Sequence, residues 1–135
     1  MKIKEPEQNF VVFAIVSAED DYYLAGNINS ILSLDLKRIE HPMLKNELSN
    51  GKTISCFNCT CPKTNVEYSF ICNKYEEIRL IPQLQNIDFI LKISGFLTKE
   101  QINNIAASIR TVKGITACMN LNVKKTPAFN ILERI

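Results

Sequence analysis

The feature that most constrains the fold is an apolar segment, Ile87 to Ile93, that follows a proline break at Ile81-Pro82. Proline fixes its own φ angle and moves the preceding residue out of the helical region, so the break ends whatever element comes before it. Within the segment, one set of alternate positions is entirely apolar: Ile87, Phe89, Leu91 and Ile93. The other set contains one aliphatic residue, Ile90. This period of two predicts a central β-strand with one apolar face and a second face that is partly covered.

Five more strands and two helices are predicted around this segment. Runs rich in β-branched and aromatic residues, bounded by turn formers, predict strands. They are expected at Phe10–Val16, Leu36–Met43, Thr53–Thr60, Val66–Tyr75 and Ile115–Val123. The strands at Thr53–Thr60 and Val66–Tyr75 are expected to form a hairpin, because Pro62 and Asn65 lie between them.

Both helices carry recognisable end signals. Ser17 is expected to cap the first helix, which carries acids in its first turn and runs to about Leu34. Gly26 costs about 1 kcal/mol relative to alanine inside a helix, so its presence predicts a close packing contact. Thr98, with a glutamine three residues later, predicts a capping box at the start of the second helix, and Gly114 ends that helix.

The predicted order, β-α-β-β-β-β-α-β, indicates an α+β fold. Two split β-α-β halves would form a ferredoxin-like sandwich, with two helices on one face of an antiparallel sheet and an inserted hairpin. The 135 residues fit a single domain, 1–135, with a core at about 10–123 and flexible or docked tails at 1–8 and 126–135. The second sheet face needs solvent or a partner, and a homodimer is our first expectation.

Composition argues against several classes of function. The 16 basic and 14 acidic side chains give a net charge of +2 and form no basic block, so we expect no nucleic-acid partner. No apolar run reaches the roughly 18 residues of a membrane span. The N-terminus lacks the pattern of a signal peptide, and the 5 cysteines suit a reducing compartment. These features predict a cytoplasmic protein with no membrane association.

The segment Ile81-Pro82-Gln83-Leu84-Gln85-Asn86-Ile87-Asp88-Phe89 resembles the motif Ile-Pro-Glu-x-x-x-Val-Asp-Tyr, for which an uncharacterised bacterial family, IPExxxVDY, is named. Supporting stretches cover roughly residues 10 to 122. They are Asp21-Tyr22-Tyr23-Leu24 with Leu34 and Leu36, the run from Phe89 to Gly95, and the final helix-glycine-strand unit. The resemblance implies a small cytoplasmic bacterial protein with no assigned activity.

Three motif positions differ from the family name. Gln83 stands in place of glutamate, Ile87 in place of valine and Phe89 in place of tyrosine. Gln83 cannot act as a general acid or base, and Phe89 has no hydroxyl group. We therefore expect the motif residues to build a structural corner and not a catalytic site: Ile81, Pro82, Gln83, Ile87, Asp88 and Phe89.

Four cysteines have the spacing C-x2-C-x-C-x10-C: Cys56, Cys59, Cys61 and Cys72. Thiolates at such a spacing can bind zinc or cycle as a dithiol. On a strand, however, Cys59 and Cys61 share one face while Cys56 points to the other, so three ligands would not converge without a bulge. Free cysteine is also a small, usually buried hydrophobe. Packing is the favoured interpretation, with no cofactor, and a metal site is the alternative.

A few other polar residues are candidates for function. Asp21, Tyr22 and Tyr23 open the first helix and could face a ligand, although acids there also interact with the helix dipole. Asp88 lies inside the apolar strand, where it is either solvated or, as we prefer, a brace for the turn Ile81–Gln85. His41, the single histidine, fits a solvated loop better than a catalytic base.

The leading hypothesis from the sequence is a non-enzymatic cytoplasmic domain that dimerises and serves in interaction or in regulatory binding of a small ligand. That step rests on analogy with other ferredoxin-like folds. The alternative is a metal-binding or redox protein that uses the Cys56–Cys72 hairpin.

Overall fold

A computed structural model describes residues 10–40, 54–75, 78–121 and 132–133. Within these residues the elements are β1 (Phe10–Ser17), α1 (Asp21–Leu32), β2 (Lys37–Ile39), β3 (Cys56–Thr60), β4 (Glu67–Cys72), β5 (Lys74–Tyr75), β6 (Ile78–Arg79), β7 (Phe89–Ser94), α2 (Lys99–Arg110) and β8 (Ile115–Leu121). His41 and the predicted tail at 1–8 lie outside the described residues, as does most of the tail at 126–135.

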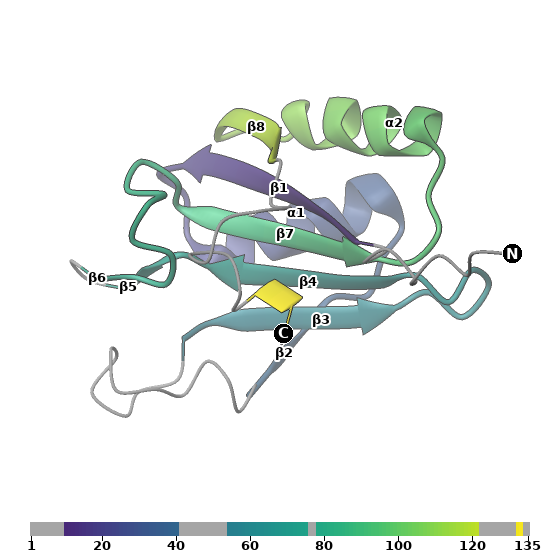
Figure 1. Cartoon of the computed structure of the whole chain (residues 1–135), viewed down its shortest axis with the longest axis horizontal. Helices are drawn as coiled ribbons and strands as arrows, with labels where there is room; N and C mark the ends of the chain where they lie inside the picture. The colour runs from purple at the N-terminus through teal and green to yellow at the C-terminus, as the bar shows by residue number, and fades with distance from the viewer. Residues whose placement is uncertain (1–9, 41–53, 76–77, 122–131, 134–135) are drawn as a thin grey trace, which may run out of the picture.

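The main sheet has six strands in the order β2-β3-β4-β7-β1-β8 (Figure 1), and every neighbouring pair is antiparallel. The short strands β5 and β6 pair separately at the end of the sheet where β4 stops and β7 starts. The α+β class is therefore confirmed, and β7 has the central position predicted for it. The six-strand order differs from that of a four-stranded ferredoxin-like sheet.

The sheet has a hydrophobic cluster on each face. On one face, α1 and α2 pack against side chains such as Phe13, Phe70 and Leu91. On the other face, Ile71 and Ile90 are fully buried, as alternate apolar positions on a covered strand predict. The residues that join them there include Ile81, Ile87 and Leu132, so the chain itself covers this part of the second face.

The first helix starts later than predicted. Asp20, not Ser17, is the N-cap, and its carboxylate accepts a hydrogen bond from the Tyr23 backbone amide at 2.7 Å. Ser17 instead ends β1, where its hydroxyl donates to the Gly114 carbonyl at 2.7 Å. The expectation of close packing at Gly26 was also wrong, because a Cβ built there has no heavy atom within 4 Å.

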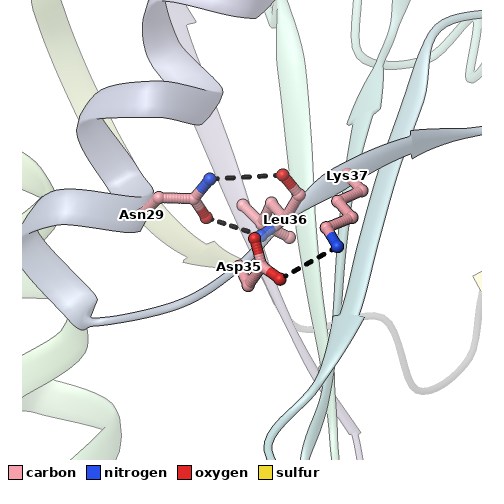
Figure 2. A network of polar contacts seen from close by, with 4 residues as sticks. All are labelled: Asn29, Asp35, Leu36 and Lys37. Atoms are coloured by element: carbon pink, nitrogen blue, oxygen red, sulfur yellow. Dashed lines mark hydrogen bonds and ion pairs between the residues drawn. The ribbon is translucent and has the colours of Figure 1, made fainter.

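The chain leaves α1 through a short connection held by Asn29 (Figure 2). Ser33 adopts a left-handed conformation, with φ 54°, and ends the helix. The Asn29 side-chain amide then donates to the Leu36 carbonyl at 3.2 Å and accepts from the Leu36 amide at 2.7 Å. These two bonds satisfy both backbone groups of Leu36 as the chain enters β2.

The second helix has the predicted start. Thr98 accepts from the Gln101 amide at 3.1 Å, and the Gln101 side chain accepts from the Thr98 amide at 2.8 Å, which is a complete capping box. The predicted end was wrong, because the helix ends at Arg110 with Thr111 as its C-cap, three residues before Gly114. Gly114 has φ 99°. A Cβ on Gly114 would lie 2.5 Å from Glu19 Cγ, so glycine is required both for the backbone angle and for this close approach.

Candidate functional site

The Ile81–Ile87 segment forms a corner of two consecutive turns. The Leu84 amide donates to the Ile81 carbonyl at 2.9 Å, and the Ile87 amide donates to the Leu84 carbonyl at 3.2 Å. Ile81 and Ile87 are buried, whereas Pro82 and Gln83 are exposed. The buried motif residues pack inside the protein, and the exposed Gln83 can replace glutamate without disturbing that packing.

Asn73 holds this corner in place. Its side-chain amide donates to the carbonyls of Leu84 and Ile87 at 2.9 and 2.8 Å, and its side-chain oxygen accepts from the Ile81 amide at 2.9 Å. Asn73 is 1% exposed, so the three bonds satisfy its buried amide group. Asn73 also lies between β4 and β5: its backbone amide donates to the Asp88 carbonyl at 2.9 Å, while its carbonyl accepts from the Leu80 amide at 2.7 Å. The strand predicted at Val66–Tyr75 therefore breaks at this residue.

The predicted role of Asp88 was only partly right. Asp88 is half-buried and its carboxylate is a brace, but it accepts from the Ser17 amide at 2.9 Å and has no contact with the Ile81–Gln85 turn among the hydrogen bonds of the described residues. The Asp88 amide also donates to the Ile15 carbonyl at 3.1 Å. Asp88 thus ties the start of β7 to the end of β1.

A groove of about 480 Å³ opens beside this brace. Its volume lies within the range of small-molecule sites, about 300–1,000 Å³. The side chains that line it come from the ends of four strands of the main sheet, from β5 and from the β1–α1 loop: Val16, Ser17, Ala18, Glu19, Cys72, Lys74, Asp88, Phe89 and Thr116.

The antiparallel order explains why these residues meet. β1 and β4 both pair antiparallel with β7, so the carboxyl ends of β1 and β4 lie at the same end of the sheet as the start of β7. β8 starts there too, because it is antiparallel to β1. In Figure 1 this is the end that carries the β5–β6 hairpin. The groove therefore lies where chain segments more than 90 residues apart converge, as the Ser17–Gly114 hydrogen bond illustrates.

The groove contains charges of both signs. Glu19 and Asp88 supply carboxylates, and Lys74 supplies an ammonium group. Glu19 and Lys74 are both exposed, and neither forms an ion pair with another described residue. The Glu19 backbone is fixed, because its amide donates to the Ser17 hydroxyl at 3.1 Å. A fixed wall with unpaired charges at its rim can bind a polar ligand.

Cys72 lines the groove as a neutral thiol. Burial raises its pKa and outweighs the opposite effect of a hydrogen bond with the Lys74 backbone, and the carboxylates of Asp21 and Asp88 also raise it. The thiol also donates to the Lys74 carbonyl at 2.7 Å. A protonated thiol is a weak nucleophile, so Cys72 contributes shape and polarisability to the groove at neutral pH, and not covalent chemistry.

The other three candidates at the start of α1 lie outside the groove. Asp21 accepts hydrogen bonds from the Ser55 hydroxyl and the Tyr22 amide. The Tyr22 ring packs edge-on against Phe57, with 5.3 Å between centroids, and its hydroxyl accepts from Arg38. The Tyr23 hydroxyl donates to the Lys113 carbonyl at 3.0 Å. These contacts connect α1 to its neighbours.

The cysteines of the β3–β4 hairpin do not converge. Cys56 packs in the cluster on the second sheet face, whereas Cys59 packs against the helix-covered face. Cys61 lies in the turn, where hydrogen bonds from the Thr64 hydroxyl and from the Lys63 and Thr64 amides lower its pKa. Among the described residues, no group of three or more histidine, cysteine, aspartate or glutamate side chains is arranged to hold a metal ion.

Comparisons with protein-family models, with curated proteins and with solved structures gave no match. Membership of the IPExxxVDY family therefore stays a prediction. Among the described residues, no helix has the length and apolar character needed to cross a membrane.

Sequence reasoning singled out three of the groove residues, Cys72, Asp88 and Phe89, but missed most of the others. Ser17 was assigned to a helix cap, and Lys74 and Thr116 were not singled out. The one local signal was Asn73, an amide residue that weakens a strand assignment and so marks a break just before Lys74.

Proposed function

We propose that this protein is a non-enzymatic regulatory domain that binds a small polar ligand in the groove between Ser17, Lys74 and Asp88. The observation that carries the proposal is the groove itself, which has a ligand-sized volume and is lined by charged residues that form no ion pair with another described residue. Its walls come from rigid strand ends, and the Ser17–Asp88 bond fixes two of them. A preformed site of this kind binds without a large ordering cost.

Binding is favoured over catalysis by the state of the groove's side chains. The thiol of Cys72 is held protonated, and the Ser17 hydroxyl is engaged as a donor to Gly114 and as an acceptor from Glu19. Neither group has a base placed to activate it within the described residues. The motif residue Gln83 is exposed and has no acid or base function.

A substitution that fills the groove tests this proposal. Ala18 is exposed and lines the groove, so Ala18→Trp should block the groove without disturbing the core. The matched control is Ala107→Trp on the exposed face of α2. A fragment library is screened by ligand-observed NMR against the wild type and both variants. We expect fragments that bind the wild type and Ala107→Trp but not Ala18→Trp. Equal binding to all three proteins, or no binding to the wild type, would refute the proposal.

At the level of the fold, we propose that β8-β1-β7-β4 are the four strands of a ferredoxin-like sandwich and that β2 and β3 extend it at one edge. The proposal is supported by the alternation of these strands with α1 and α2. We also propose a cytoplasmic location and descent from the IPExxxVDY family. The burial of Ile81, Ile87 and Phe89 supports the structural role expected of the motif.

Dimerisation stays a prediction. It was expected because the second sheet face needed cover, but the chain itself buries Ile71 and Ile90 on that face. Ligand binding in the groove needs no second copy. Light scattering on the purified full chain decides between a monomer and a homodimer.

A further inference from the structure

The charges at the groove point to the class of ligand that it takes. Two acidic residues, Glu19 and Asp88, and one basic residue, Lys74, line the groove. The ion pair found among the described side chains is elsewhere, between Lys37 and Asp35 at 3.3 Å. Opposite charges that line one groove without pairing are complementary to a ligand that carries both signs.

We propose that the groove binds a small zwitterion with a primary ammonium and a carboxylate, which is the chemistry of a free amino acid. This inference rests on the proposed function, because it names the ligand class of the same groove. Glu19 and Asp88 accept hydrogen bonds from the ligand's ammonium group. Lys74 donates to the ligand's carboxylate.

The hydrogen bonds already present leave these groups available. The Ser17 amide occupies one oxygen of Asp88, Oδ2. A carboxylate has about four lone-pair sites, so Asp88 retains capacity for an ammonium donor. The Cys72 thiol donates to the Lys74 backbone carbonyl, and the Lys74 side chain forms no ion pair with another described residue. Each ligand charge therefore meets a group of opposite sign.

The remaining walls suit the uncharged part of an amino acid. Val16, Ala18 and Phe89 supply apolar surface, and the protonated Cys72 adds a polarisable one. Apolar walls with a few placed polar groups are typical of small-ligand sites, where the polar groups fix the orientation.

The test compares each amino acid with derivatives that lack one charge. The standard L-amino acids are titrated calorimetrically into the full chain, followed by the methyl ester and the N-acetyl derivative of each binder. We expect at least one amino acid to bind, and both derivatives to bind about tenfold more weakly or worse, because each loses a charge-assisted hydrogen bond. Derivatives that bind as tightly as the parent, or the absence of any amino-acid binder, would overturn the inference.

Two variants test which residue recognises each charged group of the ligand. Lys74→Met should weaken the parent amino acid about tenfold and leave the affinity for its methyl ester unchanged. Glu19→Gln should weaken the parent and leave the affinity for the N-acetyl derivative unchanged. Lys63→Met and Glu100→Gln make the same changes at exposed positions outside the groove and should have no effect. A Lys74→Met variant that weakens the ester as much as the parent would contradict carboxylate recognition by Lys74.

Failure of this inference can be separated from failure of the proposed function. A fragment with a single charge that binds the wild type and is excluded by Ala18→Trp, while no amino acid binds, refutes the zwitterion and leaves the groove as a ligand site. If Ala18→Trp excludes nothing that binds the wild type, the groove is not the site, and both proposals fail.

Discussion

At the scale of single residues, one buried asparagine decides the shape of the motif region. The Asn73 side chain contacts backbone groups that are 8, 11 and 14 residues further along the chain. The Asn73 amide supplies a partner to the Ile81 amide and to the Ile87 carbonyl. It also gives a second donor to the Leu84 carbonyl, which accepts from the Ile87 amide as well. The start of β7 and the groove beside it depend on this corner.

Removing that amide should be costly. Asn73→Ala leaves the Ile81 amide and the Ile87 carbonyl without these partners, which should lower the free energy of unfolding by about 3 kcal/mol or more. Asn29 makes two side-chain bonds and Asn58 makes one, to Ser69 Oγ. Urea denaturation of Asn73→Ala, Asn29→Ala and Asn58→Ala should show the largest loss of unfolding free energy for Asn73→Ala and the smallest for Asn58→Ala. Equal losses at Asn73 and Asn58 would contradict the brace.

Two glycines should respond in opposite directions to alanine. Gly26 lies in α1 with open space around its Cβ position, so Gly26→Ala should raise the free energy of unfolding by about 0.5–1 kcal/mol. Gly114→Ala should lower it, because the backbone has φ 99° and the new Cβ would meet Glu19. Thermal denaturation of both variants shows whether each substitution stabilises or destabilises the protein. A destabilised Gly26→Ala variant would show a packing role that the structure lacks.

The buried thiols make stability depend on alkaline pH. Burial raises the pKa of the Cys118 thiol from 9.0 to about 11. Burial also raises the pKa of the Cys56 thiol to about 11. The unfolded thiol therefore ionises first as the pH rises, so Cys118 contributes stability that is complete below about pH 9 and is lost by about pH 11. Between about pH 9 and about pH 11, the unfolding free energy of the wild type should fall relative to that of Cys118→Ala. A constant difference would contradict burial of the thiol.

At the scale of elements, the alternation of apolar residues predicted the strands well, because burial of one or both faces leaves a periodic record in the sequence. The points where strands and helices begin and end were harder to predict. Ser17 has the residue type of a helix cap, but its hydroxyl is used by Gly114, 97 residues away, and Asp20 caps α1 instead. Local propensity cannot reveal such a distant partner.

The two edges of the sheet are protected in different ways. β2 is three residues long and exposes Lys37 and Arg38, and charges of this kind discourage pairing with another chain. β8 is seven residues long and has no charged residue. Arg110 covers it instead, since its guanidinium donates twice to the Cys118 carbonyl, from Nε at 3.1 Å and from Nη2 at 2.9 Å. A side chain of α2 thus occupies a hydrogen-bond acceptor of β8.

Loss of this cover should promote self-association. Arg110→Met keeps much of the side-chain length but removes the donors, which frees the Cys118 carbonyl for another strand. Sedimentation velocity should detect larger species that increase with concentration. Lys113→Met removes the same charge nearby and serves as the control. An Arg110→Met variant that sediments as the wild type does would show that Arg110 has no role in protecting the edge.

At the scale of the whole molecule, the groove is a product of topology. Its lining comes from residues 16–19, 72, 74, 88–89 and 116, and strands β1, β4, β7 and β8 bring these segments to one end of the sheet. No local pattern joins them, which is why the sequence predicted the helices and the main-sheet strands in order but neither the β5–β6 pair nor the site. The IPExxxVDY-like motif contributes Asp88 and Phe89 to the groove and places its other residues in the supporting corner.

The central claim, that this groove is where the protein binds its ligand, is tested most directly by mapping a bound amino acid with ¹H–¹⁵N NMR. A binder found by calorimetry is added to the labelled full chain, and the shifted amide signals are assigned. We expect the largest changes at Ser17, Glu19, Lys74 and Thr116 and none at the turn that contains Cys61. Changes centred on the Cys56–Cys72 hairpin outside the groove, with none at Ser17 or Thr116, would contradict it.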